Sequence, residues 1–290
     1  MLFRSISPLI GEKIDIPAPD VNTNGKIMSW MVDAYENVVK KSAPGVFTGK
    51  PVEFGGSLAR TEATGYGVNF AAVQALEKLG KDVKGATYAI QGFGNVGYHT
   101  GYYAHQSGAK VVAVSTVDVA IYNENGLDME ALFKEFQEKG FITNEAGYGK
   151  EISNAELLAL DVDVLAPCAL ENQLTSENAG KVRAKIVVEG ANGPTTPEAD
   201  AILRQNGVLV VPDILANCGG VVVSYFEWVQ NLQGYYWEFD EVQEKETVVL
   251  RRAFRDIWNL AQEYDVDLRT ASYMMSIRRV EKAMKLRGWY

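Results

Sequence analysis

Three glycines, Gly92, Gly94 and Gly97, carry the clearest chemical signal in this sequence, because their G-x-G-x-x-G spacing suits a pyrophosphate. The apolar run Tyr88-Ala89-Ile90 precedes them, so they open a strand-to-helix turn. In such a turn the first glycine permits the bend, the second lets the backbone approach the phosphates, and the third lets the helix pack on the strand. The amides and the positive dipole of the helix start then face the anion. The predicted dinucleotide-binding residues are Gly92, Phe93, Gly94, Asn95, Val96 and Gly97.

Asp20 is the candidate for proton transfer, since a nicotinamide cofactor implies hydride transfer and the substrate side then needs an acid or a base. It ends the segment Ile16-Pro17-Ala18-Pro19-Asp20, in which two prolines fix the backbone that leads to the carboxylate. The alternative is that Asp20 only caps the helix or turn that follows it.

Histidine and cysteine chemistry is poorly supported. The chain has two histidines, and His99 falls inside the helix expected after the glycine turn, where packing or exposure explains it. The two cysteines, Cys168 and Cys218, are far apart and form no CxxC motif. We therefore expect two buried thiols, with neither a disulfide framework nor a zinc site.

Composition places the chain among ordinary globular proteins. Its 290 residues are 47% hydrophobic and 22% charged, which is enough for one large domain or two small ones. A formal net charge of -9 argues against nucleic acid or an anionic membrane as a partner. No apolar run reaches the ~18 residues of a membrane span, and the first residues lack the pattern of a signal peptide. The expected location is the cytoplasm.

The elements that must position these residues read as an α/β fold. Apolar runs typical of buried parallel strands alternate with helical stretches, which predicts a doubly wound, Rossmann-type, mostly parallel sheet. Ligands of such sheets bind at the carboxyl ends of the strands, where several runs end in small or polar residues. Beyond the strand before Gly92, the predicted strands are residues 110–115, 162–167, 186–190 and 207–212.

Two helices and an irregular first segment complete the expected elements. Residues 64–79 have helical apolar spacing with Gly80 placed to end the helix, and residues 241–261 repeat the pattern. The second helix carries an apolar stripe of Leu250, Phe254, Ile257 and Leu260. After Asp20, an amphipathic segment presents Ile27, Trp30, Met31 and Tyr35. The first fifty residues are too few to bury a core, so we expect them to belong to a second domain.

Several segments together resemble glutamate dehydrogenases of the hexameric bacterial type, in the Glu/Leu/Phe/Val dehydrogenase family. With the Pro-Ala-Pro-Asp loop, the resemblance covers essentially the whole chain. The segments that carry it are residues 16–20, 55–67, 189–195, 217–231 and 269–274.

The resemblance implies NAD(P)-dependent oxidative deamination of L-glutamate to 2-oxoglutarate and ammonia, with Asp20 as the acid/base. It places Arg60 and Thr64 beside the nicotinamide, and Asn192 and Asn217 on its amide or ribose. Val221 and Ser224 are placed at the substrate, where Ser224 binds the distal carboxylate. Residues at other strand ends complete the implied cofactor site: Thr116, Asp118 and Ala169. A homohexamer is the implied assembly, and no metal is implied.

The family also uses lysines upstream of the Pro-Ala-Pro-Asp loop, and this sequence resembles an N-terminally truncated copy without them. We therefore expect impaired turnover. The expected domains are a remnant of the substrate domain in residues 1–50, the dinucleotide-binding domain in 51–265, and a helix in 266–290 that returns towards the substrate domain.

Cofactor preference is predicted from the end of the second strand, where an acid binds ribose hydroxyls and repels a 2′-phosphate. Thr116 follows Ser115 directly, Asp118 is the nearest acid, and no Lys or Arg follows, which favours NAD while NADP stays possible. Other interpretations remain: a leucine- or phenylalanine-type dehydrogenase, a non-catalytic dinucleotide-binding module, a plain βα turn, or a methyltransferase. The last gives no account of Asp20, Asn192 or Ser224.

Overall fold

The computed structural model describes residues 5–20 and 22–289. The chain forms two compact units. The first comprises Met1–Ala63 and Gly220–Val249, and the second comprises Thr64–Gly219 and Leu250–Tyr290. The domain boundaries predicted after residues 50 and 265 stay predictions.

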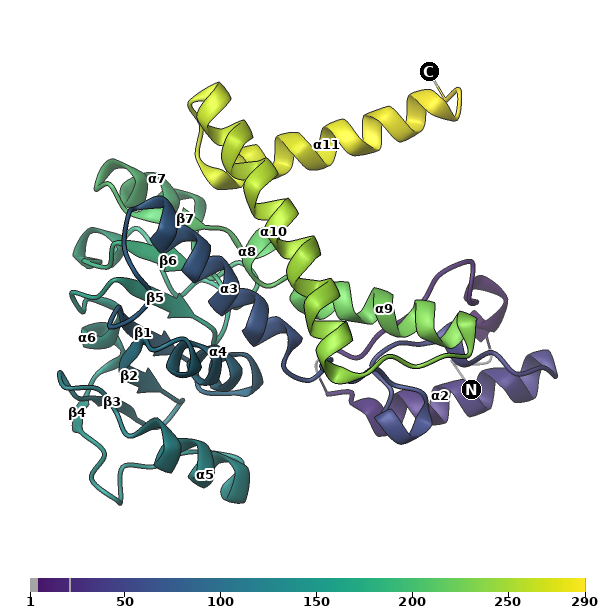
Figure 1. Ribbon diagram of the computed structural model, residues 1–290, viewed down its shortest axis with the longest axis horizontal. Helices are drawn as coiled ribbons and strands as arrows, with labels where there is room; N and C mark the ends of the chain where they lie inside the picture. The colour runs from purple at the N-terminus through teal and green to yellow at the C-terminus, as the bar shows by residue number, and fades with distance from the viewer. Residues whose placement is uncertain (1–4, 21, 290) are drawn as a thin grey trace. The chain divides into compact units, whose positions relative to one another are not determined.

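The second unit is built on a sheet whose described strands follow the order β4-β3-β2-β1-β5-β6-β7 (Figure 1). Five strands are parallel: β1 (Thr87–Gln91), β2 (Lys110–Ser115), β5 (Val164–Pro167), β6 (Ile186–Val188) and β7 (Leu209–Val211). An antiparallel edge is formed by β3 (Ala120–Tyr122) and β4 (Lys150–Ile152). The predicted doubly wound, mostly parallel α/β fold is confirmed.

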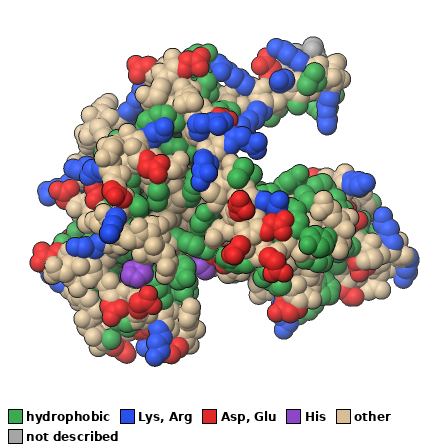
Figure 2. Space-filling model, in the orientation of Figure 1, with side chains coloured by type: hydrophobic (Ala, Val, Ile, Leu, Met, Phe, Trp, Pro, Cys, Tyr) green, Lys and Arg blue, Asp and Glu red, His purple; other side chains and the backbone are tan. Residues whose placement is uncertain are grey.

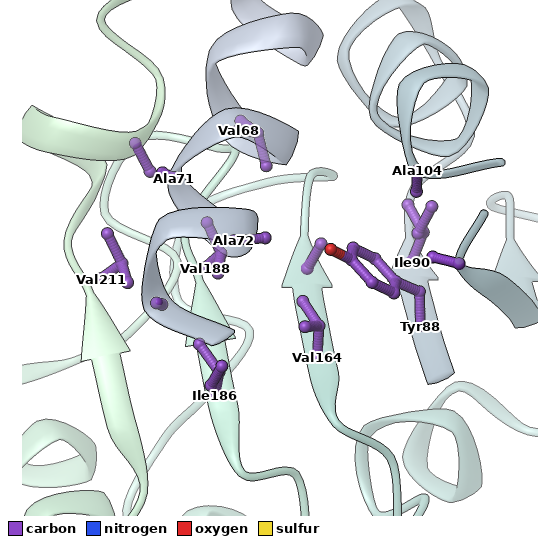
Figure 3. Packing of buried hydrophobic residues seen from close by; sticks show 14 of the residues in the cluster. Val68, Ala71, Ala72, Tyr88, Ile90, Ala104, Val164, Ile186, Val188 and Val211 are labelled. Carbon is purple, nitrogen blue, oxygen red and sulfur yellow. The ribbon is translucent and has the colours of Figure 1, made fainter. Parts of the chain in front are cut away.

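Each parallel strand buries both faces, which explains why the strands read as unbroken apolar runs. In β1, Tyr88 and Ile90 join one core and Ala89 joins the other. Figure 3 shows the first core, where Val68 and Ala72 of the helix α3 (Ala63–Lys78) face the strands. This core also packs against α4 (Asn95–Gln106), α5 (Met129–Lys139), the later part of α10 (Phe239–Tyr264) and α11 (Leu268–Leu286). The opposite core packs against α6 (Asn154–Leu158), η4 (Ala179–Lys181) and α7 (Pro197–Gln205).

The two predicted helices form where their apolar spacing placed them. Helix α3 ends before Gly80, whose φ of +69° is the left-handed conformation that glycine adopts without strain. Lys81 N donates to Leu76 O there, which satisfies a carbonyl at the helix end. In α10, the four residues of the predicted apolar stripe are all buried: Leu250, Phe254, Ile257 and Leu260.

The first unit combines the first sixty residues with α9 (Gly219–Gln233) and the start of α10. Its short 3-10 turns are η1 (Ser7–Leu9), η2 (Pro44–Val46) and η3 (Val52–Phe54). Tyr35 Oη donates to Ile10 O at 3.2 Å, and Trp228 Nε1 donates to Glu12 O at 2.8 Å. These contacts fasten residues 10 and 12 to α2 (Gly25–Val39), which carries Tyr35, and to α9.

The amphipathic segment forms α2 (Gly25–Val39), and of the four apolar residues predicted for it only Trp30 lies away from the core. Met28, Val32 and Tyr35 are buried, whereas Trp30 is 60% exposed with Lys26 Nζ 5.4 Å from its ring centre. The prediction for Trp30 was therefore wrong. The face centred on Met28 and Val32 turns Trp30 outward, where its ring contacts a cation.

The surface and the cysteines add two findings. Figure 2 shows side chains of both charges interspersed over the visible surface. None of the helices in residues 5–20 and 22–289 is long and apolar enough to cross a membrane. Cys168 and Cys218 are free thiols that are only partly buried, which corrects the prediction of full burial. Cys168 directly follows β5, and Cys218 lies two residues after α8 (Asp213–Ala216).

Candidate cofactor and substrate sites

The carboxyl end of β1 is the topological switch point of the sheet. β1 pairs in parallel with β2 on one side and with β5 on the other, so the chain winds in opposite directions from it. Phe93 N donates to Ser115 O at 2.7 Å, and Cys168 N donates to Gln91 O at 2.7 Å. The turn after β1 is thus held from both neighbouring strands, at the edge where such sheets bind ligands.

The three glycines have distinct steric roles. Gly92 has a φ of +88°, and a Cβ there would lie 2.7 Å from Ala169 Cα. A Cβ on Gly97 would lie 1.8 Å from Gly92 O, so only glycine lets α4 pack this closely on the turn. A Cβ on Gly94 would meet nothing within 4 Å. Gly94 is also the N-cap of α4, so the helix start faces open space that suits the phosphates of a dinucleotide.

Two residues of the predicted turn face inward. Phe93 is buried and its ring lies 5.9 Å from that of Tyr98 and 6.4 Å from that of Phe133. Val96 packs against the first core and would lie 3.3 Å from a Cβ on Gly190. Phe93 can therefore serve a cofactor only through its backbone, while exposed Gly94 and Asn95 lie at the open helix start.

The end of β2 places Thr116 and Asp118 in a tight turn. Thr116 Oγ1 accepts hydrogen bonds from Asp118 N at 3.3 Å and from Val119 N at 3.2 Å. The Thr116 hydroxyl therefore shapes the turn, and the exposed Asp118 presents the acid. An acid at the end of the second strand is the arrangement that binds ribose hydroxyls.

Asn192 and Asn217 come together although they belong to different loops. Asn217 Nδ2 donates to Asn192 Oδ1 at 2.6 Å and to Gly190 O at 3.3 Å. Gly190 in turn leaves no room for a side chain, because a Cβ there would lie 2.5 Å from Cys168 Sγ. The loops that follow β5, β6 and β7 thus converge beside the glycine turn.

A charge network around the buried Glu189 was not predicted from the sequence. Arg269 Nη2 lies 2.6 Å from Glu189 Oε1, and Arg269 Nε lies 2.6 Å from Asp200 Oδ2. Asp213 N donates to Glu189 Oε2 at 2.8 Å, and Gly193 N donates to Asp213 Oδ2 at 2.8 Å. One feature of the sequence could have predicted this network. Glu189 directly follows a buried strand, and a buried acid requires a cation as its partner.

Electrostatics in this network favour a charged arginine. Burial opposes the charge on Arg269, but hydrogen bonds and the charges of Glu189 and Asp200 outweigh it and raise its pKa. Burial raises the pKa of Glu189, although Arg269 draws it down. Arg269 therefore stabilises the ionised form of a carboxylate that the fold has removed from water.

In the first unit, Asp20 stands at the end of its proline loop as an exposed residue. Its backbone N–H donates to Thr23 Oγ1 at 2.6 Å, and its carbonyl accepts from Thr23 N at 2.9 Å. The N-cap of α2 is Asn24, whose side chain accepts from Ile27 N. The helix-capping role considered for Asp20 thus falls to Asn24.

Arg60 and Ser224 are in direct contact. Arg60 Nε donates to Ser224 Oγ at 2.8 Å, and Ser224 is buried on α9. Burial lowers the pKa of Arg60, while the charges of Glu227 and Glu246 raise it. Val221 lies one turn earlier on α9 and is 68% exposed. Thr64 belongs to the first turn of α3, in the second unit.

The comparisons match the whole length of the chain. The model described as Glutamate/Leucine/Phenylalanine/Valine dehydrogenase matches residues 55–288, and that described as Glu/Leu/Phe/Val dehydrogenase, dimerisation domain, matches residues 1–37. The NAD-specific glutamate dehydrogenase of Clostridioides difficile is 55% identical over 98% of this chain and 69% of its own length. The glutamate dehydrogenase of Thermotoga maritima is 51% identical over 99% of this chain and 69% of its own length.

Solved structures agree with these relatives. The glutamate dehydrogenase of Peptoniphilus asaccharolyticus has a TM-score of 0.86 at 44% identity, over 99% of this chain and 69% of that one. The leucine-bound, hetero-hexameric glutamate dehydrogenase of Thermus thermophilus has a TM-score of 0.92 at 34% identity, over 100% of this chain and 68% of that one.

Proposed function

The chain belongs to the glutamate, leucine, phenylalanine and valine dehydrogenase family, and from that premise we propose that it oxidatively deaminates L-glutamate with NAD. The products are 2-oxoglutarate, ammonia and NADH. The names of the relatives from Clostridioides difficile and Thermotoga maritima support this choice.

The observation that carries glutamate over an apolar amino acid is the contact between Arg60 Nε and Ser224 Oγ at 2.8 Å. Because the serine oxygen accepts from the guanidinium, its own O–H can donate to a carboxylate. A second carboxylate needs such donors, and an aliphatic or aromatic side chain would leave them without an acceptor. The polar pair therefore supports a substrate that carries a distal carboxylate.

The cofactor proposal uses the residues of the second unit. Gly92, Gly94 and the start of α4 would hold the pyrophosphate, Asp118 the adenosine ribose, and Asn192 with Asn217 the nicotinamide end. When bound, NAD supplies the acceptor for the hydride that leaves Cα of glutamate. The acid at Asp118 favours NAD, because a carboxylate repels a 2′-phosphate.

Asp20 would carry the protons. Its carboxylate accepts a proton from the substrate ammonium before hydride loss and releases it to solvent. The ionised carboxylate then accepts a proton from the water that adds to the iminium carbon. When the C–N bond breaks, the same group returns a proton to the departing amine. Arg60 and Thr64 would flank the nicotinamide, while Val221 and Ser224 would contact the substrate side chain.

The proposal extends to assembly and location. The dimerisation-domain match over residues 1–37 and the hexameric relative from Thermus thermophilus support a homo-oligomer, of which a hexamer is the specific form. The partners are small molecules, and we propose a cytoplasmic location.

The test measures NADH formation at 340 nm with L-glutamate and with L-leucine, for the wild type, Asp20→Asn and Ser224→Ala. We expect preference for glutamate, loss of turnover in Asp20→Asn, and a higher KM for glutamate in Ser224→Ala. The same assays are run on a fusion that supplies the part of the Clostridioides difficile enzyme that this chain does not cover. Preference for leucine in either protein would overturn the proposal.

A further inference from the structure

A buried ion pair fastens residues 47–50, here called the strap, to helix α9. Lys50 Nζ lies 2.6 Å from Glu227 Oε1, and both side chains are 0% exposed. Glu227 also accepts from the backbone, with Gly49 N 2.8 Å from Oε2 and Lys50 N 3.2 Å from Oε1. Lys50 Nζ donates in addition to Phe47 O at 2.6 Å. One carboxylate and one ammonium thus fix the whole strap.

The strap lies directly against the loop that carries Asp20. Thr48 N donates to Pro17 O at 3.1 Å. Gly49 has a φ of +76°, and a Cβ there would lie 2.5 Å from Cδ and Cγ of Pro19. The strap and the proline loop are therefore in close contact at two points, and a shift of one must move the other.

Stability alone does not account for this pair. Two charges removed from water contribute little net stability, and apolar replacements of similar volume are often neutral or stabilising. Burial lowers the pKa of Lys50, although the charge of Glu227 raises it. What the pair does provide is a set of directional hydrogen bonds to three backbone groups.

We propose that Lys50 and Glu227 are positioning residues that hold Asp20 in place through the strap and the Pro17–Pro19 segment. The inference rests on the proposed function, in which Asp20 exchanges protons with the substrate. Glu227 lies three residues after Ser224 on α9, so the two side chains share a helix face. Helix α9 then positions both the Ser224 hydroxyl, which would bind the substrate, and the strap, which contacts the loop of Asp20.

The main test is Gly49→Ala. Its added Cβ collides with the Pro19 ring, while Lys50 and Glu227 are unchanged. Gly234→Ala is its matched control, because Gly234 lies in the same unit with a φ of +67° and has open space around it. Both variants introduce left-handed strain, but only the first meets the Asp20 loop.

A second variant, Glu227→Gln, removes the charge that holds Lys50. Its control is Glu241→Gln, which breaks the half-exposed ion pair with Lys245 in the same unit. For Gly49→Ala and Glu227→Gln we expect amide hydrogen exchange in residues 15–23 and at Thr48 to quicken at least about tenfold. We also expect kcat for glutamate to fall by about tenfold or more, with KM within about twofold, because Asp20 is displaced while Ser224 stays.

The outcomes separate the two proposals. Exchange rates in residues 15–23 that match those of the controls in both variants would overturn the positioning role, whether or not the protein turns over glutamate. Full turnover by Asp20→Asn would instead overturn the acid/base assignment, even with faster exchange. Faster exchange together with an unchanged kcat in Gly49→Ala would also contradict the positioning role.

Discussion

Asn217 Nδ2 lies 2.6 Å from Asn192 Oδ1, and this hydrogen bond joins the loop after β6 to the end of α8. Each of these side chains would bind the nicotinamide end, and the hydrogen bond between them fixes the orientation of both. Their contributions to cofactor binding should be coupled, since each amide fixes the other.

We predict that Asn192→Ala and Asn217→Ala each weaken NADH binding by about fivefold, which corresponds to the loss of a hydrogen bond of about 1 kcal/mol. The double variant should lose less than the sum of the two, by at least about 0.5 kcal/mol. NADH fluorescence titration measures all three, and Asn206→Ala, on the exposed C-cap of α7, serves as the control. Strict additivity would contradict the coupling.

Gly94 and Gly97 should respond differently to alanine. A Cβ on Gly97 collides with Gly92 O, so Gly97→Ala should lower the free energy of unfolding by about 2 kcal/mol or more. Gly94 has a φ of -89° and open space, so Gly94→Ala should change stability by less than about 1 kcal/mol. It should nevertheless weaken NADH binding, because its methyl group occupies the helix start where the phosphates would lie.

Denaturant melts and NADH titrations on both glycine variants check these expectations. Unchanged NADH affinity in Gly94→Ala would remove the glycine turn from the cofactor site.

Glu246 should make the stability of the protein depend on pH. The residue is 1% exposed, and its Oε1 has no hydrogen-bond partner within the described residues. Burial and the charge of Glu62 raise its pKa to about 8, against the lowering effect of Arg60. A carboxyl whose pKa is raised by folding stabilises the fold fully below its unfolded pKa, and this contribution is lost as pH rises towards 8.

Relative to the wild type, Glu246→Gln should therefore gain stability from pH 5 to pH 8, with a slope that approaches about 1.4 kcal/mol per pH unit. Urea melts at several pH values measure the slope. Glu244→Gln, at an exposed position on the same helix, should show none of it. Parallel pH profiles for wild type and Glu246→Gln would contradict the raised pKa.

Arg269→Ala should lower the free energy of unfolding, and the loss should be larger at high pH. The substitution leaves Glu189 buried without its cation, which costs about 3 kcal/mol for a broken buried pair. Because Arg269 draws the pKa of Glu189 down, its loss raises that pKa further. Stability should then fall as pH rises, so the difference from wild type is larger at pH 8 than at pH 5. Arg279→Ala, exposed on the same helix, is the control, and a pH-independent difference would argue against an ionised Glu189.

The local sequence pattern was sufficient to predict the helices and strands and the edge of the sheet at which ligands bind. The run at residues 110–115 forms β2 with the same bounds, and residues 64–79 form α3 with ends shifted by one residue. The glycine spacing placed the turn after β1, because the steric demands on Gly92 and Gly97 arise within a few residues of the chain. The same period-based reasoning misplaced Trp30, since spacing allows several helix faces and packing selects one of them.

Side-chain contacts between distant segments required the tertiary structure. Arg60 and Ser224 are 164 residues apart, and Lys50 and Glu227 are 177 residues apart. Arg60 and Ser224 were each predicted as site residues, but nothing in the sequence paired them. Lys50 and Glu227 carried no prediction. Periodicity reports which face of an element is buried, whereas the partner on that face depends on strand order and helix packing. By itself the sequence determined the fold class, the glycine turn and the family, and the tertiary structure decided which charges meet.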